Sequence, residues 1–190
     1  MKYNNLLPYL RKLAKNLDES VGEIVREEIL DGCESITAKS SKILRAHIMK
    51  EVMIRMESRM DMETAVAVRE KCACKPNNQL KPIYELFQKS PDMKTFIKDL
   101  NAMGNQGRYI LHNNIILGSY NQGKCVCSMV KATQEKIPML WCECCKGHVK
   151  WLFENTFGFP IQVEMLETIT CGQDDCRFKI TLPENPELTL

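Results

Sequence analysis

The spacing of apolar residues changes along the chain, and this change constrains the fold more than any other feature. Between residues 6 and 103 apolar side chains recur every three or four positions, as on one face of a helix. After Gly104, short stretches alternate apolar and polar residues, as in half-buried strands. We therefore predict an α+β fold, with N-terminal helices in residues 1–103 and a C-terminal antiparallel β-sheet packed by helices in residues 104–190.

The first half of the chain divides into six predicted helices, which cover residues 6–17, 19–30, 40–60, 62–71, 79–89 and 91–103. Asp18 and either Ser40 or Ser41 stand where side chains can cap a helix N-terminus. The helix over residues 40–60 carries a methionine-rich apolar stripe, which needs a partner surface. That partner is either the core of the protein or a second copy of the chain, so a homodimer through the N-terminal helices is an alternative.

The second half predicts strands at residues 109–112, 115–120 and 124–130, joined as a meander. Asn113 and Asn114 form a turn-competent pair between the first two. A helix follows over residues 144–158, ended by Gly158 and Pro160. A hairpin of residues 161–165 and 176–180 turns near Gly172 and completes the predicted sheet.

The charge balance and the N-terminus exclude several classes of partner. The 26 basic and 24 acidic residues leave a net charge of +2, so we predict neither nucleic acid nor an anionic membrane as a partner. Arg11, Lys12 and Lys15 interrupt the leucines of the first segment, which is therefore not expected to act as a signal peptide. No stretch approaches the ~20 apolar residues that span a bilayer. We expect a cytoplasmic protein whose cysteines stay reduced.

Nine of the ten cysteines fall into four local groups, at Cys72 and Cys74, Cys125 and Cys127, Cys142, Cys144 and Cys145, and Cys171 and Cys176. In a strand, residues two apart point to one side, so a Cys-x-Cys pair can aim two thiolates at one point. Two such pairs supply four sulfur ligands, which suit zinc or, alternatively, an iron-sulfur cluster. The first predicted ligands are Cys125, Cys127, Cys142 and Cys144, with Cys72, Cys74 and Cys145 as substitutes or a second site.

Two other interpretations of the cysteines remain open. A free cysteine is often a small buried hydrophobe, which suits Cys33 and Cys176. A thiol at the start of the helix after Trp141 would instead be activated by the helix N-terminus, which suits Cys144 and Cys145 as nucleophiles or as a reversibly oxidised pair. His148 lies close enough in sequence to serve as a base or a metal ligand.

The segment WCECCKGHVKWLFENTFGFPIQVEMLETITCGQDDCRFKI resembles the end of the 4-vinyl reductase domain. The similarity covers roughly residues 104–182, and the residues that carry it are Gly147, Gly158, Glu164, Gly172, Cys176 and Phe178. The same stretch is similar to L-2-amino-thiazoline-4-carboxylate hydrolase-like proteins and to cysteine-rich bacterial relatives. The resemblance implies a four- or five-stranded antiparallel sheet packed by helices around a pocket for a small organic ligand, as in sensor domains for aromatic compounds.

Some of those sensors hold a structural zinc near this hairpin through cysteines and a glutamate. Cys176 matches their hairpin cysteine, but Thr168 stands where the preceding strand has a cysteine, so their metal site does not carry over intact. We therefore predict a small-molecule-binding or sensor-type module with a structural, cysteine-ligated zinc. The alternative is a metal- or cysteine-dependent hydrolase of a small nitrogen- or sulfur-containing substrate, for which the sequence identifies no catalytic residue.

Overall fold

A computed structural model describes residues 6–127, 129–131 and 135–184, and it has the predicted α+β architecture. The described helices are α1 (Pro8–Ile29), α2 (Lys42–Arg59), α3 (Met62–Lys71), α4 (Asn77–Lys89), α5 (Met93–Ala102) and α6 (Glu143–Phe157). The strands are β1 (Arg108–His112), β2 (Ile115–Ser119), β3 (Gln162–Glu167) and β4 (Arg177–Thr181). Short 3-10 helices occur at η1 (Cys33–Ser35), η2 (Met139–Cys142) and η3 (Ile169–Cys171).

Local sequence explains most of the helix boundaries. Ser41 accepts a hydrogen bond from the Leu44 N–H at the start of α2, and Asp61 does the same for α3. Asp18 does not cap a second helix, because helical geometry continues past it to Gly22, whose φ of 81° interrupts the helix. The two helices predicted for residues 6–30 are therefore present as two helical segments within α1, with the break at Gly22 rather than at Asp18.

Four antiparallel strands form one sheet in the order β1-β2-β4-β3. The predicted strand at residues 124–130 is wrong, because the described residues there form neither strand nor bridge. Both edges of β2 are already used, one by β1 and the other by β4, so a third meander strand has no place beside it. The apolar residues of that segment pack instead against the N-terminal helices.

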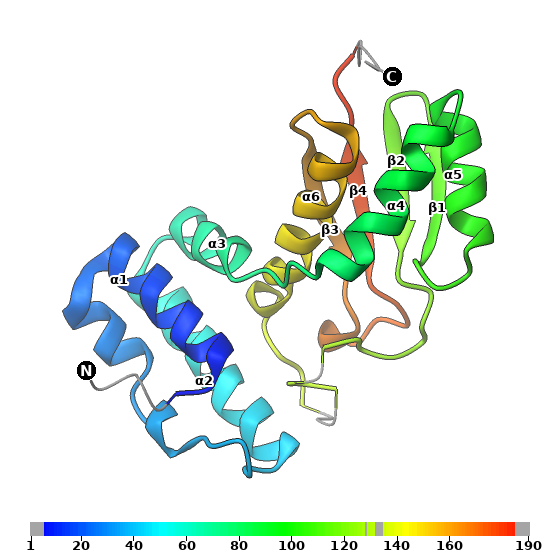
Figure 1. The fold of residues 1–190 in the computed structure, drawn as a ribbon. Coiled ribbons are helices and arrows are strands. Elements are labelled where there is room, and N and C mark those ends of the chain that lie inside the picture. Colours follow the sequence, from blue (N-terminus) through cyan, green and yellow to red (C-terminus); the bar gives the residue numbers. More distant parts are fainter. Residues whose placement is uncertain (1–5, 128, 132–134, 185–190) are drawn as a thin grey trace.

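Two hydrophobic cores divide the molecule into two lobes (Figure 1). The N-terminal lobe contains α1, α2 and α3, and its core also takes in residues from the segment 125–142. The sheet lobe contains α4, α5, α6 and the sheet, with Phe153 and Phe178 fully buried between α6 and the strands. The face of α2 buried in the first core contains Met49, Val52, Met53 and Met56, whereas Ile43 and Leu44, which the predicted stripe included, are exposed. A homodimer stays a prediction. The division of the chain at residue 104 also stays a prediction.

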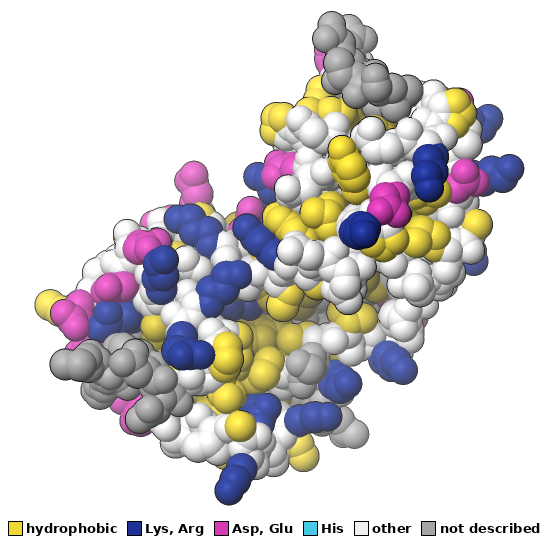
Figure 2. All heavy atoms as spheres, viewed as in Figure 1, with side chains coloured by type: hydrophobic (Ala, Val, Ile, Leu, Met, Phe, Trp, Pro, Cys, Tyr) yellow, Lys and Arg dark blue, Asp and Glu magenta, His cyan; other side chains and the backbone are white. Residues whose placement is uncertain are grey.

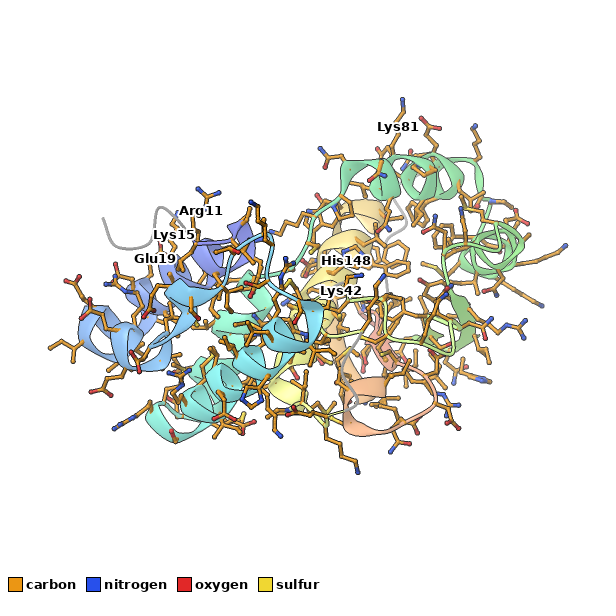
Figure 3. All side chains as sticks on the ribbon, turned by 90° about the horizontal axis from the view of Figure 1, so that it is seen from below. Arg11, Lys15, Glu19, Lys42, Lys81 and His148 are labelled. Carbon is orange, nitrogen blue, oxygen red and sulfur yellow. The ribbon has the colours of Figure 1, made fainter. Side chains whose placement is uncertain are left out.

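Charged side chains of both signs are spread over both lobes on the face shown in Figure 2. Within α1, Arg11, Lys15 and Glu19 project from the helix surface (Figure 3), where Lys15 and Glu19 form an exposed ion pair. Among the described residues, no helix is both long enough and apolar enough to cross a bilayer.

The lobes meet where α3 crosses α6 at very short range. Gly147 of α6 lies against the backbone of Glu70, and a β-carbon at residue 147 would stand 2.3 Å from the Glu70 carbonyl oxygen. Lys146 strengthens the same crossing, because its Nζ lies 2.6 Å from Glu70 Oε1 and 2.8 Å from Glu143 Oε2. Glycine is therefore required at residue 147 for the two helices to approach this closely.

We predict that Gly147→Ala destabilises the protein by about 1–3 kcal/mol, because the added methyl group forces the two helices apart. Alanine is otherwise the better helix former by about 1 kcal/mol, so a loss of stability must come from the clash. Urea unfolding followed by circular dichroism measures the effect. Gln88→Ala, at an exposed position of α4, is the control and should stay within about 0.5 kcal/mol of the parent. An unchanged midpoint in Gly147→Ala would contradict the close contact.

Candidate thiol site

Arg69 of α3 is a buried cation that rests on Trp141, just before α6. Its side chain is among the largest that are fully buried, with 2% of the residue exposed. Its Nη2 donates a hydrogen bond of 2.8 Å to the Trp141 carbonyl oxygen, and its Cζ lies 4.4 Å from the centre of the Trp141 rings. The Tyr9 ring meets the same indole edge to face at 6.2 Å. Arg69 thus joins α3 to the segment that begins α6.

No carboxylate in the described part of the chain forms an ion pair with Arg69, and its Nε has no hydrogen-bond acceptor there. The nearest acidic groups on these helices, Glu70 and Glu143, are held by Lys146 instead. A buried charge without a counter-charge is costly. The positive charge of Arg69 acts on two thiols and a hydroxyl. Burial raises the pKa of Cys72 and of Tyr9, and Arg69 opposes that effect, whereas Arg69 contributes to the lowered pKa of Cys144.

Cys144 lies in the first turn of α6 and is half-buried. Interaction with the adjacent Cys145 thiol lowers the pKa of Cys144 below its ordinary value, and the Arg69 guanidinium lowers it further against the effect of burial. The same pairing raises the pKa of Cys145. Cys144 is therefore the member of this pair with the lower pKa, and its deprotonated form would place a negative charge near the Arg69 guanidinium.

Thiols from three segments surround Cys144. Burial raises the pKa of each of these neighbours, and the charge of Cys144 raises it further. They come from the end of α3, from the loop after β2 and from η2: Cys72, Cys125, Cys127 and Cys142. Together with Cys145, five of the other predicted metal ligands thus lie within electrostatic range of Cys144.

The indole N–H of Trp141 lies beside the sulfur of Cys127 and lowers the pKa of that thiol, opposing burial. No acceptor within the described ranges completes a full hydrogen bond to this buried N–H. Trp141 also meets Cys144, whose Sγ lies 3.4 Å from the Trp141 carbonyl oxygen. One residue thus contacts Arg69, Cys127 and Cys144.

Cys74 is exposed on the linker between α3 and α4, and its carbonyl oxygen accepts a hydrogen bond of 2.8 Å from Nδ1 of His148. His148 lies on α6 between the two lobes (Figure 3) and is bound to this backbone rather than to a sulfur atom. Cys33 is fully buried in the N-terminal core, as a small hydrophobe would be.

Cys142, one of the predicted zinc ligands, lies beside hydroxyl groups. Its sulfur lies 3.0 Å from the hydroxyl oxygen of Thr170, and the hydroxyl of Thr168 lies 3.1 Å from that of Thr170. The Cys142 sulfur is therefore already engaged by a threonine. Across the described residues, no three His, Cys, Asp or Glu side chains are arranged to hold a metal ion. Zinc or an iron-sulfur cluster stays a prediction.

Sequence analysis missed Arg69 and Trp141 as parts of this site. Arg69 follows Ala65 by four positions and so falls on the buried face of α3, where a cation is unexpected. A basic residue on the buried face of a helix was therefore the feature of the sequence that could have identified Arg69. Trp141 directly precedes the cysteine-rich start of α6, but nothing in its spacing indicates a contact with residue 69.

Comparisons with known proteins give a family and a similarity to solved structures. Residues 11–187 match the family described as "Family of unknown function (DUF6144)". No curated protein matches the chain. An H-NOX protein from S. oneidensis in the Fe(II) ligation state, crystallised as a triple mutant, is 17% identical with a TM-score of 0.46, covering 96% of this chain and 98% of that chain. The resemblance to the 4-vinyl reductase domain stays a prediction.

We predict that Cys144 is alkylated by iodoacetamide at a pH where ordinary thiols, with a pKa of about 8.5, are largely protonated. Its reactivity should fall only as the pH drops through its lowered pKa. Arg69→Met keeps the bulk of the side chain but removes the charge, and should raise that pKa and slow alkylation at pH 7 severalfold. Mass spectrometry of the modified peptide gives the rate, with glutathione as the reference thiol. Identical pH profiles for Cys144 and glutathione would contradict the assignment.

Proposed function

Because the chain belongs to the family of unknown function DUF6144, we propose its function from its own geometry: a sensor-type, small-molecule-binding module with a thiolate site for a soft metal ion, zinc first. One observation carries the proposal. A fully buried guanidinium that has no ion pair with a described carboxylate lies within electrostatic range of the Cys144 and Cys72 thiols, and Cys144 in turn lies within range of thiols from the loop after β2 and from η2. Such a cation favours sulfur in its anionic form, which is the form that binds metals.

The charge balance supports a metal-thiolate centre at this place. Zinc bound by three or four thiolates is an anionic unit, and burying it requires a compensating positive charge. Arg69 supplies that charge, and the buried Trp141 N–H supplies a donor directed at sulfur. Arg69 and the Trp141 N–H are both buried near the thiols, and the sulfur atoms must move closer together to bind an ion.

The proposed ligands differ in part from those predicted from spacing. Cys144 is the central ligand, and Cys127, Cys145 and Cys72 are its partners, with Cys125 as the substitute. Cys142 is less suited than predicted, because its sulfur already contacts the Thr170 hydroxyl. Cys74 is exposed on the linker between α3 and α4 and is not among the proposed ligands. An iron-sulfur cluster at the same thiols is the alternative centre and would be recognised by its visible absorption.

The position of the thiols supports a sensor-type function. Cys72 and Cys127 pack against the core of the N-terminal lobe, whereas Cys144 and Cys145 begin the helix that covers the sheet. A ligand bound to both sets would link the lobes where α3 crosses α6. The hydrolase alternative needs a base near the thiols, and His148 is engaged by the Cys74 carbonyl, so no observation favours that alternative.

We predict that the reduced protein binds zinc in competition with a chromophoric chelator, and that Cys144→Ser weakens binding at least about a hundredfold. Arg69→Met, which removes only the compensating charge, should weaken it by about 10–100-fold. Cys74→Ser is the matched control from the same sequence motif and should leave the affinity unchanged. Circular dichroism confirms that each variant is folded. Ten freely titratable thiols in the presence of zinc would refute the metal site.

A further inference from the structure

We propose that Asn16 of α1 is a positioning residue for metal binding, which holds the sulfur of Cys72 in the orientation of a ligand. The inference rests on the proposed function, because it assigns a role at the same thiol site. It brings a third helix into that site, since the proposed ligands come from the end of α3, the start of α6 and the loop after β2.

Asn16 is a polar residue on the buried face of α1. Before the break at Gly22, the other buried residues of this helix are apolar: Leu10, Leu13, Ala14 and Leu17. Asn16 is 8% exposed, so its amide needs a hydrogen-bond partner inside the protein. Its Nδ2 donates a hydrogen bond of 3.4 Å to the sulfur of Cys72, which lies 56 residues away in the sequence. The buried amide of α1 is thus directed at a proposed ligand.

Lys12 makes a second contact from α1 to the same place. It precedes Asn16 by four residues, so both side chains leave one face of the helix. Its Nζ donates a hydrogen bond of 2.6 Å to the carbonyl oxygen of Ala73. Cys72 is the C-cap of α3, and Ala73 follows where the helix has ended. One turn of α1 therefore holds the sulfur of the first residue and the carbonyl of the next, which fixes the direction of the Cys72 side chain.

The hydrogen bond from Asn16 suits a sulfur that binds a metal. A cysteine ligand is deprotonated, so its sulfur accepts hydrogen bonds and donates none. The side-chain N–H of Asn16 is such a donor, and donors of this kind orient ligands in metal sites. Cys142 has instead the hydroxyl of Thr170 beside its sulfur, and a hydroxyl can also accept a hydrogen bond from a thiol. The geometry therefore favours Cys72 over Cys142 as a ligand.

The test measures cobalt(II) binding to the reduced full-length protein. Cobalt(II) replaces zinc at thiolate sites, and its sulfur-to-cobalt charge-transfer absorption increases with the number of bound thiolates. Asn16→Leu keeps the size of the side chain but removes the donor. It should weaken cobalt binding by about 10–100-fold and lower the charge-transfer absorption to the level of Cys72→Ser. Circular dichroism verifies folding, and Asn16→Ala takes the place of the leucine variant if that variant does not fold.

A double-mutant cycle separates positioning of the sulfur from a general effect on the fold. In the Cys72→Ser background, Asn16→Leu should change the cobalt affinity by less than about twofold, because the sulfur that it positions is gone. Thr170→Val is the matched control, since it removes the side-chain partner of another cysteine sulfur, that of Cys142. It should leave the affinity and the spectrum unchanged.

Three results would overturn the inference, and they are distinguishable. An equal loss of affinity from Asn16→Leu with and without Cys72 would show that Asn16 acts on the fold in general. Cobalt binding that is lost in Cys144→Ser but unchanged in Asn16→Leu would refute this inference alone. A parent protein that binds no cobalt would refute the proposed function together with this inference.

Discussion

The burial of the Arg69 guanidinium against Trp141 is the interaction on which the rest of the site depends. A cation removed from water must be compensated, and here the compensation comes from a carbonyl oxygen, an aromatic face and a group of thiols. The arrangement joins α3 to the start of α6. The same guanidinium, together with the adjacent Cys145 thiol, lowers the pKa of Cys144.

Much of the fold follows from local sequence patterns, because helices and hairpins are specified by residues close together in the chain. Ser41, Asp61 and Gly158 bound helices through capping and a left-handed backbone, and each can be recognised in the sequence. The wrong strand at residues 124–130 has a different origin. Alternation predicts a strand but not whether a sheet edge is free, and β4 returns from far along the chain to occupy it.

The candidate site was less predictable for a related reason. Spacing identifies pairs of cysteines that can act together, and Cys144 emerged from its place at a helix start. The spacing of cysteines in the sequence does not show which sulfur atoms come close together in the fold, or that Cys142 contacts Thr170. Arg69 was missed because the cost of burying a charge is evident only when the packing around it is known.

The contact between Gly147 and Glu70 limits how this chain can diverge. The backbone of residue 147 packs directly on the backbone of Glu70, with no side chain between the two helices. No substitution of a side chain by one of similar size can therefore preserve this spacing. Substitutions can accumulate on the outer faces of both helices while this spacing is kept. A larger residue at position 147 would push α3 from α6 and so separate Arg69 from Cys144. One substitution would then disturb both the contact between the lobes and the environment of the thiol.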